Sequence, residues 1–224
     1  MIAYLLLLLV FIAAVTDWVA VSKGWKRVEF TAKPATMALL FLWLGVVSRL
    51  QGALLWFGLG ILFSLAGDVF LIFSDRWFIP GLFAFLLAQL MYIVGFNSPL
   101  PQVAPMWILG LALLLALTSA LVLRNVTAGL ATKGLRRLIA PVLLYGMVAT
   151  LMLLSAMLTI FRLEWNIGSS FLATFGAAFF YFSDVVLAWN KYVAPIKNGR
   201  RINIVAYHLG QIALIVGVAF QFMK

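Results

Sequence analysis

The sequence predicts an all-α, polytopic membrane bundle of eight transmembrane helices, forming a single integral membrane domain over residues 1–224. Of its residues 66% are hydrophobic and only 10% are charged, which is more apolar surface than a soluble domain of this size can bury. The apolar runs are near the roughly 20 residues that cross a hydrocarbon core about 30 Å thick. None alternates apolar and polar residues as a barrel strand does, so helices are expected. The expected spans are roughly 3–22, 31–48, 53–74, 78–97, 103–123, 138–160, 168–190 and 202–223.

The composition also excludes several kinds of site and partner. The first apolar run is longer than the core of a signal peptide and follows no positive residue, so we expect a retained helix. The chain has no cysteine, which excludes disulfides and thiolate chemistry, and with a single histidine we expect no zinc site, no other metal and no cofactor. The formal net charge of +10 would favour nucleic-acid binding in a soluble protein, whereas here it indicates topology. The expected partners are membrane lipids and a lipid substrate, not nucleic acid.

The positive residues predict the orientation of the helices. By the positive-inside rule, the odd-numbered loops are cytoplasmic and both termini lie outside. We therefore expect a multi-pass protein of the bacterial inner membrane. Of the 16 Lys and Arg residues, three fall on the outer side: Arg49, Arg162 and Lys224. The remainder flank the odd-numbered loops: Lys23, Lys26, Arg27, Lys33, Arg76, Arg124, Lys133, Arg136, Arg137, Lys191, Lys197, Arg200 and Arg201.

A weak internal similarity relates the third and seventh spans. The segment Gly67–Leu71 reads Gly-Asp-Val-Phe-Leu, and Ser183–Leu187 reads Ser-Asp-Val-Val-Leu. Two four-helix halves related by duplication would run in the same direction, as in a parallel repeat, and would place the two aspartates equivalently. Two short matches can also arise by chance.

Three aspartates lie inside predicted spans, where each charge costs about 2.5–3.5 kcal/mol on insertion scales and is therefore a functional candidate. Asp17, Asp68 and Asp184 each lie some five or six residues, or roughly 8 Å of helix rise, from the cytoplasmic end. The second, sixth and eighth spans place polar groups at similar depth, which predicts a polar site in the cytoplasmic half: Lys33, Tyr145, Tyr207, His208 and Gln211. On the fourth span Gln89, Tyr92 and Asn97 are expected progressively farther outward.

Each of these groups also has a structural interpretation. Asp17 can form an ion pair with Lys23 or Lys33 at the membrane interface, and ion pairs are the usual way to stabilise a charge near a helix end. Asp68 and Asp184 can form interhelical hydrogen bonds, and a single buried histidine such as His208 is more often a packing residue than a ligand. The hydrogen-bonding partners considered for the two aspartates are Ser64, Ser183 and Tyr207.

The order and spacing of short motifs over most of the chain resemble the YhhN-like membrane proteins, a family that includes the lysoplasmalogenases. In one departure, Gln89 stands where that family often has a histidine. The resemblance implies hydrolysis of the vinyl ether bond of lysoplasmalogens to a fatty aldehyde and a glycerophospho-alcohol. The residues that carry it are Lys33-Pro34, Phe63-Ser64-Leu65-Ala66-Gly67-Asp68, Gly81, Phe85, Tyr92, Pro141, Tyr145, Gly176-Ala177, Ser183-Asp184, Leu187-Ala188, Tyr207 and Gln211.

Two buried carboxyl groups can perform this reaction. One carboxylic acid protonates the alkene carbon and the other carboxylate activates water, as in inverting glycoside hydrolysis. Asp68 and Asp184 are the candidate acid/base pair, with either residue as the acid. The residues expected to bind or orient substrate and water are Lys33, Tyr145, Tyr207, His208, Gln211, Ser64, Ser183 and Asp17.

Two other classes of function compete with the hydrolase. Intramembrane aspartates and parallel repeats also mark proton-coupled transporters, although here the polar groups gather toward one face of the bilayer rather than at its midplane. A non-catalytic lipid-binding protein would be favoured if the aspartates are paired with lysine or arginine. The choice between choline and ethanolamine headgroups stays open.

Overall fold

The computed structural model describes residues 1–73, 75–100 and 102–223, and within them eight helices are long and apolar enough to cross a membrane. No strand occurs in this described part of the chain, which confirms the all-α polytopic fold class. Short 3-10 turns flank several helices, and a π-helical turn, Trp189–Val193, follows the seventh. The helices are α1 (Ile2–Lys23), α2 (Lys26–Ser48), α3 (Ala53–Phe73), α4 (Phe78–Phe96), α5 (Pro105–Thr132), α6 (Ile139–Leu158), α7 (Ile167–Ala188) and α8 (Gly199–Phe222).

Helix ends differ from the predicted spans mainly where polar residues flank an apolar run. α2 begins at Lys26 rather than near residue 31, and α5 continues to Thr132 rather than ending near 123. Polar side chains at the interface are solvated by water and headgroups, so they end the apolar run without ending the helix. One consequence is that Lys33 and Pro34 lie inside α2 instead of opening it.

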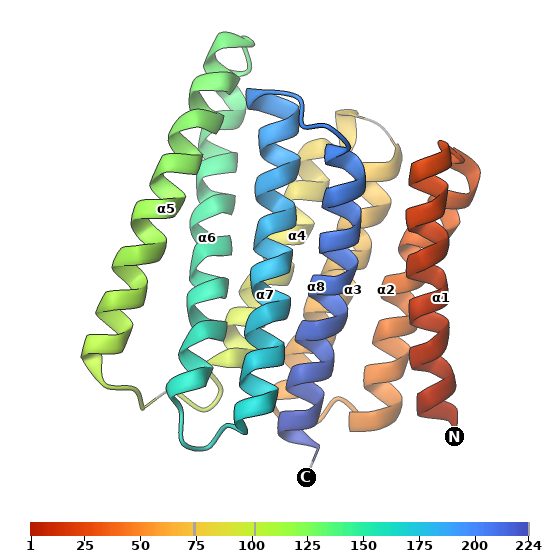
Figure 1. Ribbon diagram of the computed structural model, residues 1–224, viewed down its shortest axis with the longest axis vertical. Helices are drawn as coiled ribbons and strands as arrows, with labels where there is room; N and C mark the ends of the chain where they lie inside the picture. Colours follow the sequence, from red (N-terminus) through yellow and green to blue (C-terminus); the bar gives the residue numbers. More distant parts are fainter. Residues whose placement is uncertain (74, 101, 224) are drawn as a thin grey trace.

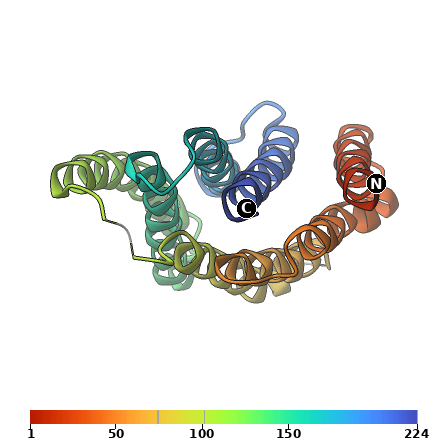
Figure 2. The same ribbon diagram turned by 90° about the horizontal axis from the view of Figure 1, so that it is seen from below.

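The helices form a curved row with a pair on its concave side. Seen along the helix axes, α5, α6, α4, α3, α2 and α1 follow one another around the arc, and α7 and α8 lie within it (Figure 2). In the most apolar stretch of 18 residues, 67% of the residues of α8 are buried, whereas in α5 only 6% are. The centre of the bundle is therefore α8, and α5 is a peripheral helix that exposes leucines to lipid.

Glycines allow α7 and α8 to pack closely. A Cβ atom on Gly176 would lie 2.1 Å from the backbone nitrogen of Leu214, and one on Gly210 would lie 2.6 Å from the backbone nitrogen of Phe180. Small residues at such crossings let two backbones approach, which is a common way to pack helices without a hydrophobic driving force. Asn166 caps α7 by accepting hydrogen bonds from the N–H groups of Gly168 and Ser169.

Both termini lie at one end of the bundle, and the loops after α1, α3, α5 and α7 lie at the other (Figure 1). We call the latter the basic end, because it carries the arginines and lysines of the odd-numbered loops; its cytoplasmic location stays a prediction. Arg162 at the opposite end has a structural role, since its guanidinium donates to the carbonyl groups of Phe96 and Pro99 at 2.7 and 3.0 Å. Lys224 and Ser74, the predicted end of the third span, lie outside the described residues.

Candidate active site

Asp68 on α3 is fully buried and is held by a cation and a hydroxyl group. Lys33 Nζ on α2 lies 2.9 Å from Asp68 Oδ1. The hydroxyl of Tyr207 on α8 donates to Asp68 Oδ2 at 2.8 Å. A carboxylate paired with an ammonium group and hydrogen-bonded on its other oxygen is suited to remain ionised in a low-dielectric interior. The predicted hydrogen bond with Tyr207 is therefore present, and Lys33, one of the partners considered for Asp17, pairs instead with Asp68.

Asp184 on α7 accepts hydrogen bonds from two neutral groups. Tyr145 Oη on α6 donates to Asp184 Oδ2 at 2.8 Å, and Gln89 Nε2 on α4 donates to the same oxygen at 3.0 Å. Gln89 Nε2 also lies 2.9 Å from Tyr145 Oη, so the three side chains form a closed triangle. Asp68 thus has an ionic environment, whereas the donors to Asp184 carry no charge.

The two aspartates line one cavity of about 110 Å³ in the half of the bundle nearer the basic end. Ser183 also lines it; its hydroxyl donates to the Phe180 carbonyl, while its own carbonyl accepts from Asn203. Most of the remaining lining is apolar and comes from helices α3 to α8: Leu71, Phe78, Leu82, Phe85, Val122, Leu123, Val126, Val142, Gly146, Ala149, Val185, Leu187, Ala188 and Ile204. The cavity therefore combines carboxyl groups with walls that suit an alkyl chain.

Gln211 and Ser64 lie outside the lining of this cavity and form a second buried network. Tyr92 Oη on α4 donates to Gln211 Oε1 at 2.7 Å, and Gln211 Nε2 donates to Ser64 Oγ at 3.0 Å. All three side chains are fully buried. The network ties α8 to α3 and α4, one turn along α8 from Tyr207, so it supports the position of the Tyr207 hydroxyl.

Asp17 and His208 form a separate buried pair between α1 and α8. His208 Nε2 lies 4.0 Å from Asp17 Oδ2, and Trp18 Nε1 donates to His208 Nδ1 at 3.2 Å. Because Nδ1 accepts a hydrogen bond, neutral His208 carries its proton on Nε2, facing Asp17. Neither side chain lines the cavity. Of the three aspartates predicted at one depth, the structure brings together only Asp68 and Asp184.

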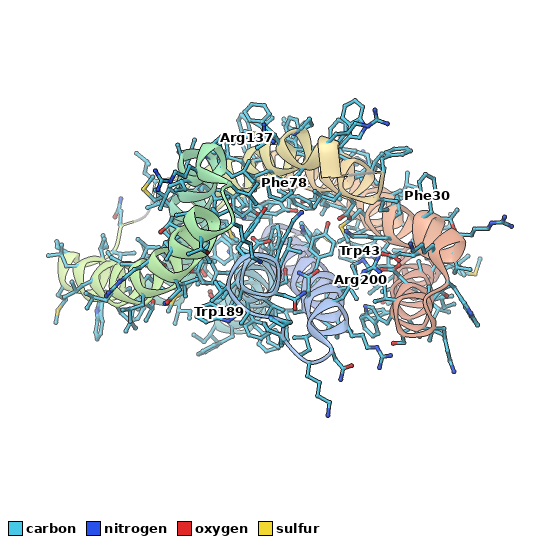
Figure 3. All side chains as sticks on the ribbon, turned by 90° about the horizontal axis from the view of Figure 1, so that it is seen from above. Phe30, Trp43, Phe78, Arg137, Trp189 and Arg200 are labelled. Atoms are coloured by element: carbon cyan, nitrogen blue, oxygen red, sulfur yellow. The ribbon has the colours of Figure 1, made fainter. Side chains whose placement is uncertain are left out.

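A larger hollow of about 550 Å³ lies at the basic end, which Figure 3 views from above. We call it the vestibule. It shares six lining residues with the cavity, so the two spaces adjoin: Lys33, Leu71, Leu187, Lys191, Asn203 and Ile204. The rest of its lining is Val21, Lys26, Glu29, Phe30, Ile72, Asn190, Gly199 and Arg200. It is the more polar of the two spaces.

Two residues that lie at the site, Gln89 and Lys191, were not predicted there from the sequence. Gln89 was expected farther outward, but its long side chain reaches Asp184; its departure from the family pattern was the only signal pointing to it. Lys191 was not among the predicted site residues, yet it lines both the cavity and the vestibule. Within the described residues, no three His, Cys, Asp or Glu side chains are grouped so that they could hold a metal ion.

The fold and the site define an all-α multi-pass membrane protein with two carboxyl groups in an intramembrane cavity. The model of the YhhN family matches residues 28–218, and the chain belongs to this family. It is 30% identical over 210 residues to lysoplasmalogenase TMEM86B of Mus musculus, covering 89% of this chain and 78% of that protein. It is 31% identical over 180 residues to lysoplasmalogenase TMEM86B of Homo sapiens, covering 78% and 67% respectively. No solved structure gives a significant match.

Proposed function

We propose that the protein is a membrane-embedded hydrolase that cleaves the vinyl ether bond of a lysoplasmalogen, with Asp184 as the acid and Asp68 as the base. The observation that carries the proposal is that these two carboxyl groups line one cavity with apolar walls and have contrasting environments. The relatives named lysoplasmalogenase support the same reaction.

The first step is proton transfer from Asp184 to carbon. Asp184 Oδ2 accepts two neutral hydrogen bonds, which leaves Oδ1 as the site of the acidic proton. That proton adds to the alkene carbon that is not bonded to the ether oxygen and that carries the alkyl chain, and the electron pair of the double bond forms the new C–H bond. The adjacent carbon and the ether oxygen then share the positive charge as an oxocarbenium ion. Protonation by a positioned acid contributes typically about 10²–10⁴-fold to such a rate.

Asp68 completes the reaction by activating water. Its ion pair with Lys33 and its hydrogen bond from Tyr207 hold it as a carboxylate, which accepts a proton as water attacks the oxocarbenium carbon. The product of this step is a hemiacetal. Its hydroxyl proton returns to Asp184 as the C–O bond breaks, and the proton on Asp68 passes to the departing glycerol oxygen. Aldehyde and alcohol result, and both carboxyl groups regain their starting forms.

A non-catalytic lipid-binding function is the second candidate, and the Lys33–Asp68 ion pair is the specific observation that favours it. An ion pair explains the burial of Asp68 without any chemistry. It leaves Asp184 unexplained, because an amide would serve equally well beside Tyr145 and Gln89 if only hydrogen bonding were needed. The hydrolase accounts for both carboxyl groups.

The test is aldehyde release from lysoplasmalogen by purified protein in detergent, with a saturated ether lysolipid as the control substrate. The proposal expects aldehyde from the vinyl ether lipid alone, and loss of release in Asp68→Asn and Asp184→Asn proteins that remain folded. Absence of aldehyde from well-folded wild-type protein with either choline or ethanolamine headgroups would reject the hydrolase. Near-normal activity of either variant would reject the two-carboxylate mechanism.

A further inference from the structure

The vestibule is a strongly cationic space, and of its positive side chains the proposed chemistry uses only Lys33, the partner of Asp68. Four of its lining residues are positive, Lys26, Lys33, Lys191 and Arg200, and one is negative, Glu29. Arg200 is ion-paired with Glu29 and Lys33 with Asp68, and the lining still has a net positive charge when both carboxylates are counted. A cationic space that large, lined by flexible ammonium groups, favours an anion with several acceptor oxygens.

The position of the lysines connects this charge to the cavity. Lys33 and Lys191 line both spaces, on opposite elements, α2 and the π-helical turn after α7. The turn is held in place by Lys133, whose ammonium group donates to the Lys191 carbonyl at 2.7 Å, and the Nζ of Lys191 lies 4.4 Å from the centre of the Phe78 ring. An anion in the vestibule would therefore lie beside the polar entrance of the apolar cavity.

We propose that the vestibule binds the phosphate group of a single-chain lipid whose alkyl chain occupies the adjoining cavity. The proposal rests on the proposed function, because it identifies the bound lipid with the substrate. In a lysolipid only the short glycerol backbone separates the ether oxygen from the phosphate. A phosphate held by Lys26 and Lys191 thus places the ether bond near Asp68, whose partner Lys33 borders the same vestibule.

Binding of a lipid that cannot be hydrolysed tests this inference separately from catalysis. The dissociation constant of a saturated ether lysophospholipid in neutral detergent is compared with that of the alkylglycerol of equal chain length, which lacks phosphate. We expect the phosphate-bearing lipid to bind at least roughly tenfold more tightly, the effect of about one charge-assisted hydrogen bond. The Lys26→Gln/Lys191→Gln variant should lose this preference, and the charge-retaining Lys26→Arg variant should keep it.

The matched control is Arg136→Gln/Arg137→Gln, which removes two exposed charges outside the vestibule lining. Figure 3 labels Arg137 at the basic end of the bundle. This control should keep the preference. Equal affinity of wild-type protein for the two lipids, or equal losses in the two double variants, would overturn the proposal. Competition by inorganic phosphate at the concentration where the lysolipid binds would also overturn the proposal, because the site would then recognise free phosphate. Competition by a two-chain phosphatidylglycerol at that concentration would overturn it too, because the site would then recognise bulk lipid. Because turnover is not measured, these results stand whether or not aldehyde is released.

Discussion

The two carboxyl groups of the cavity come from similar short motifs but have unlike surroundings. Asp68 is fully buried, ion-paired with Lys33 and hydrogen-bonded by Tyr207, whereas Asp184 accepts hydrogen bonds from the neutral groups of Tyr145 and Gln89. A division of labour between two carboxyl groups requires environments that keep one ionised and let the other hold a proton. In the proposed mechanism the neighbours, which come from α2, α4, α6 and α8, set different roles for two residues that look equivalent in the sequence.

The largest expected difference is in turnover. Asp184→Asn removes the only proposed proton donor to carbon and should lower kcat by about 10²–10⁴-fold. Asp68→Asn should cost less, because water can still attack an oxocarbenium ion that has already formed. The measurement is kcat for aldehyde release by both variants. A greater loss in Asp68→Asn would reverse the assignment of acid and base, and equal losses would contradict it.

The next effect is on stability. Lys33→Met leaves the Asp68 carboxylate buried without its cation and should lower the free energy of unfolding by about 3–5 kcal/mol. The double variant Lys33→Met/Asp68→Asn should recover much of that loss, because no charge is then left unpaired. Denaturant unfolding in detergent measures both, with Arg137→Met as the control at the same end. A double variant no more stable than Lys33→Met would show that the ion pair is not the cause.

A smaller effect is expected when each carboxyl group loses the tyrosine hydroxyl that donates a hydrogen bond to it. Tyr207→Phe deletes a hydrogen bond to a charged acceptor and should cost about 1.5–3 kcal/mol of unfolding free energy, whereas Tyr145→Phe deletes one to a neutral acceptor and should cost about 0.5–1.5 kcal/mol. Denaturant unfolding in detergent measures the loss of unfolding free energy in both variants. If Tyr145→Phe proves the costlier change, Asp184 is the more strongly charged of the two groups.

The smallest expected effect concerns Gln89. A histidine at this position keeps an N–H donor for Asp184, so Gln89→His should retain activity within about tenfold of wild type, equivalent to roughly 1.4 kcal/mol in the barrier. Gln89→Leu removes the donor at similar bulk and is the matched comparison, with a larger loss expected. Steady-state aldehyde release measures both variants. Identical activity of the His and Leu variants would mean that the Gln89 hydrogen bond does not influence the acid.

The sequence alone determined the eight spans, the all-α class and the choice of Asp68 and Asp184 as candidates. The physical reason is the bilayer, whose fixed thickness sets the length of each apolar run and makes every charge within it costly. Depth along a helix can be counted from the sequence. The family resemblance added the reaction expected of these residues, which the comparisons support in its broad class.

Only the tertiary structure decided which groups at that depth meet. Asp17 shares the predicted depth of Asp68 but faces His208, while Gln89, expected elsewhere, reaches Asp184. Fully apolar spans have no amphipathic pattern to show which side faces inward, so rotation about each helix axis follows from packing against its neighbours. The close contact of α7 and α8 at Gly176 and Gly210 is one such determinant, and it places Asp184 and Tyr207 around the same cavity.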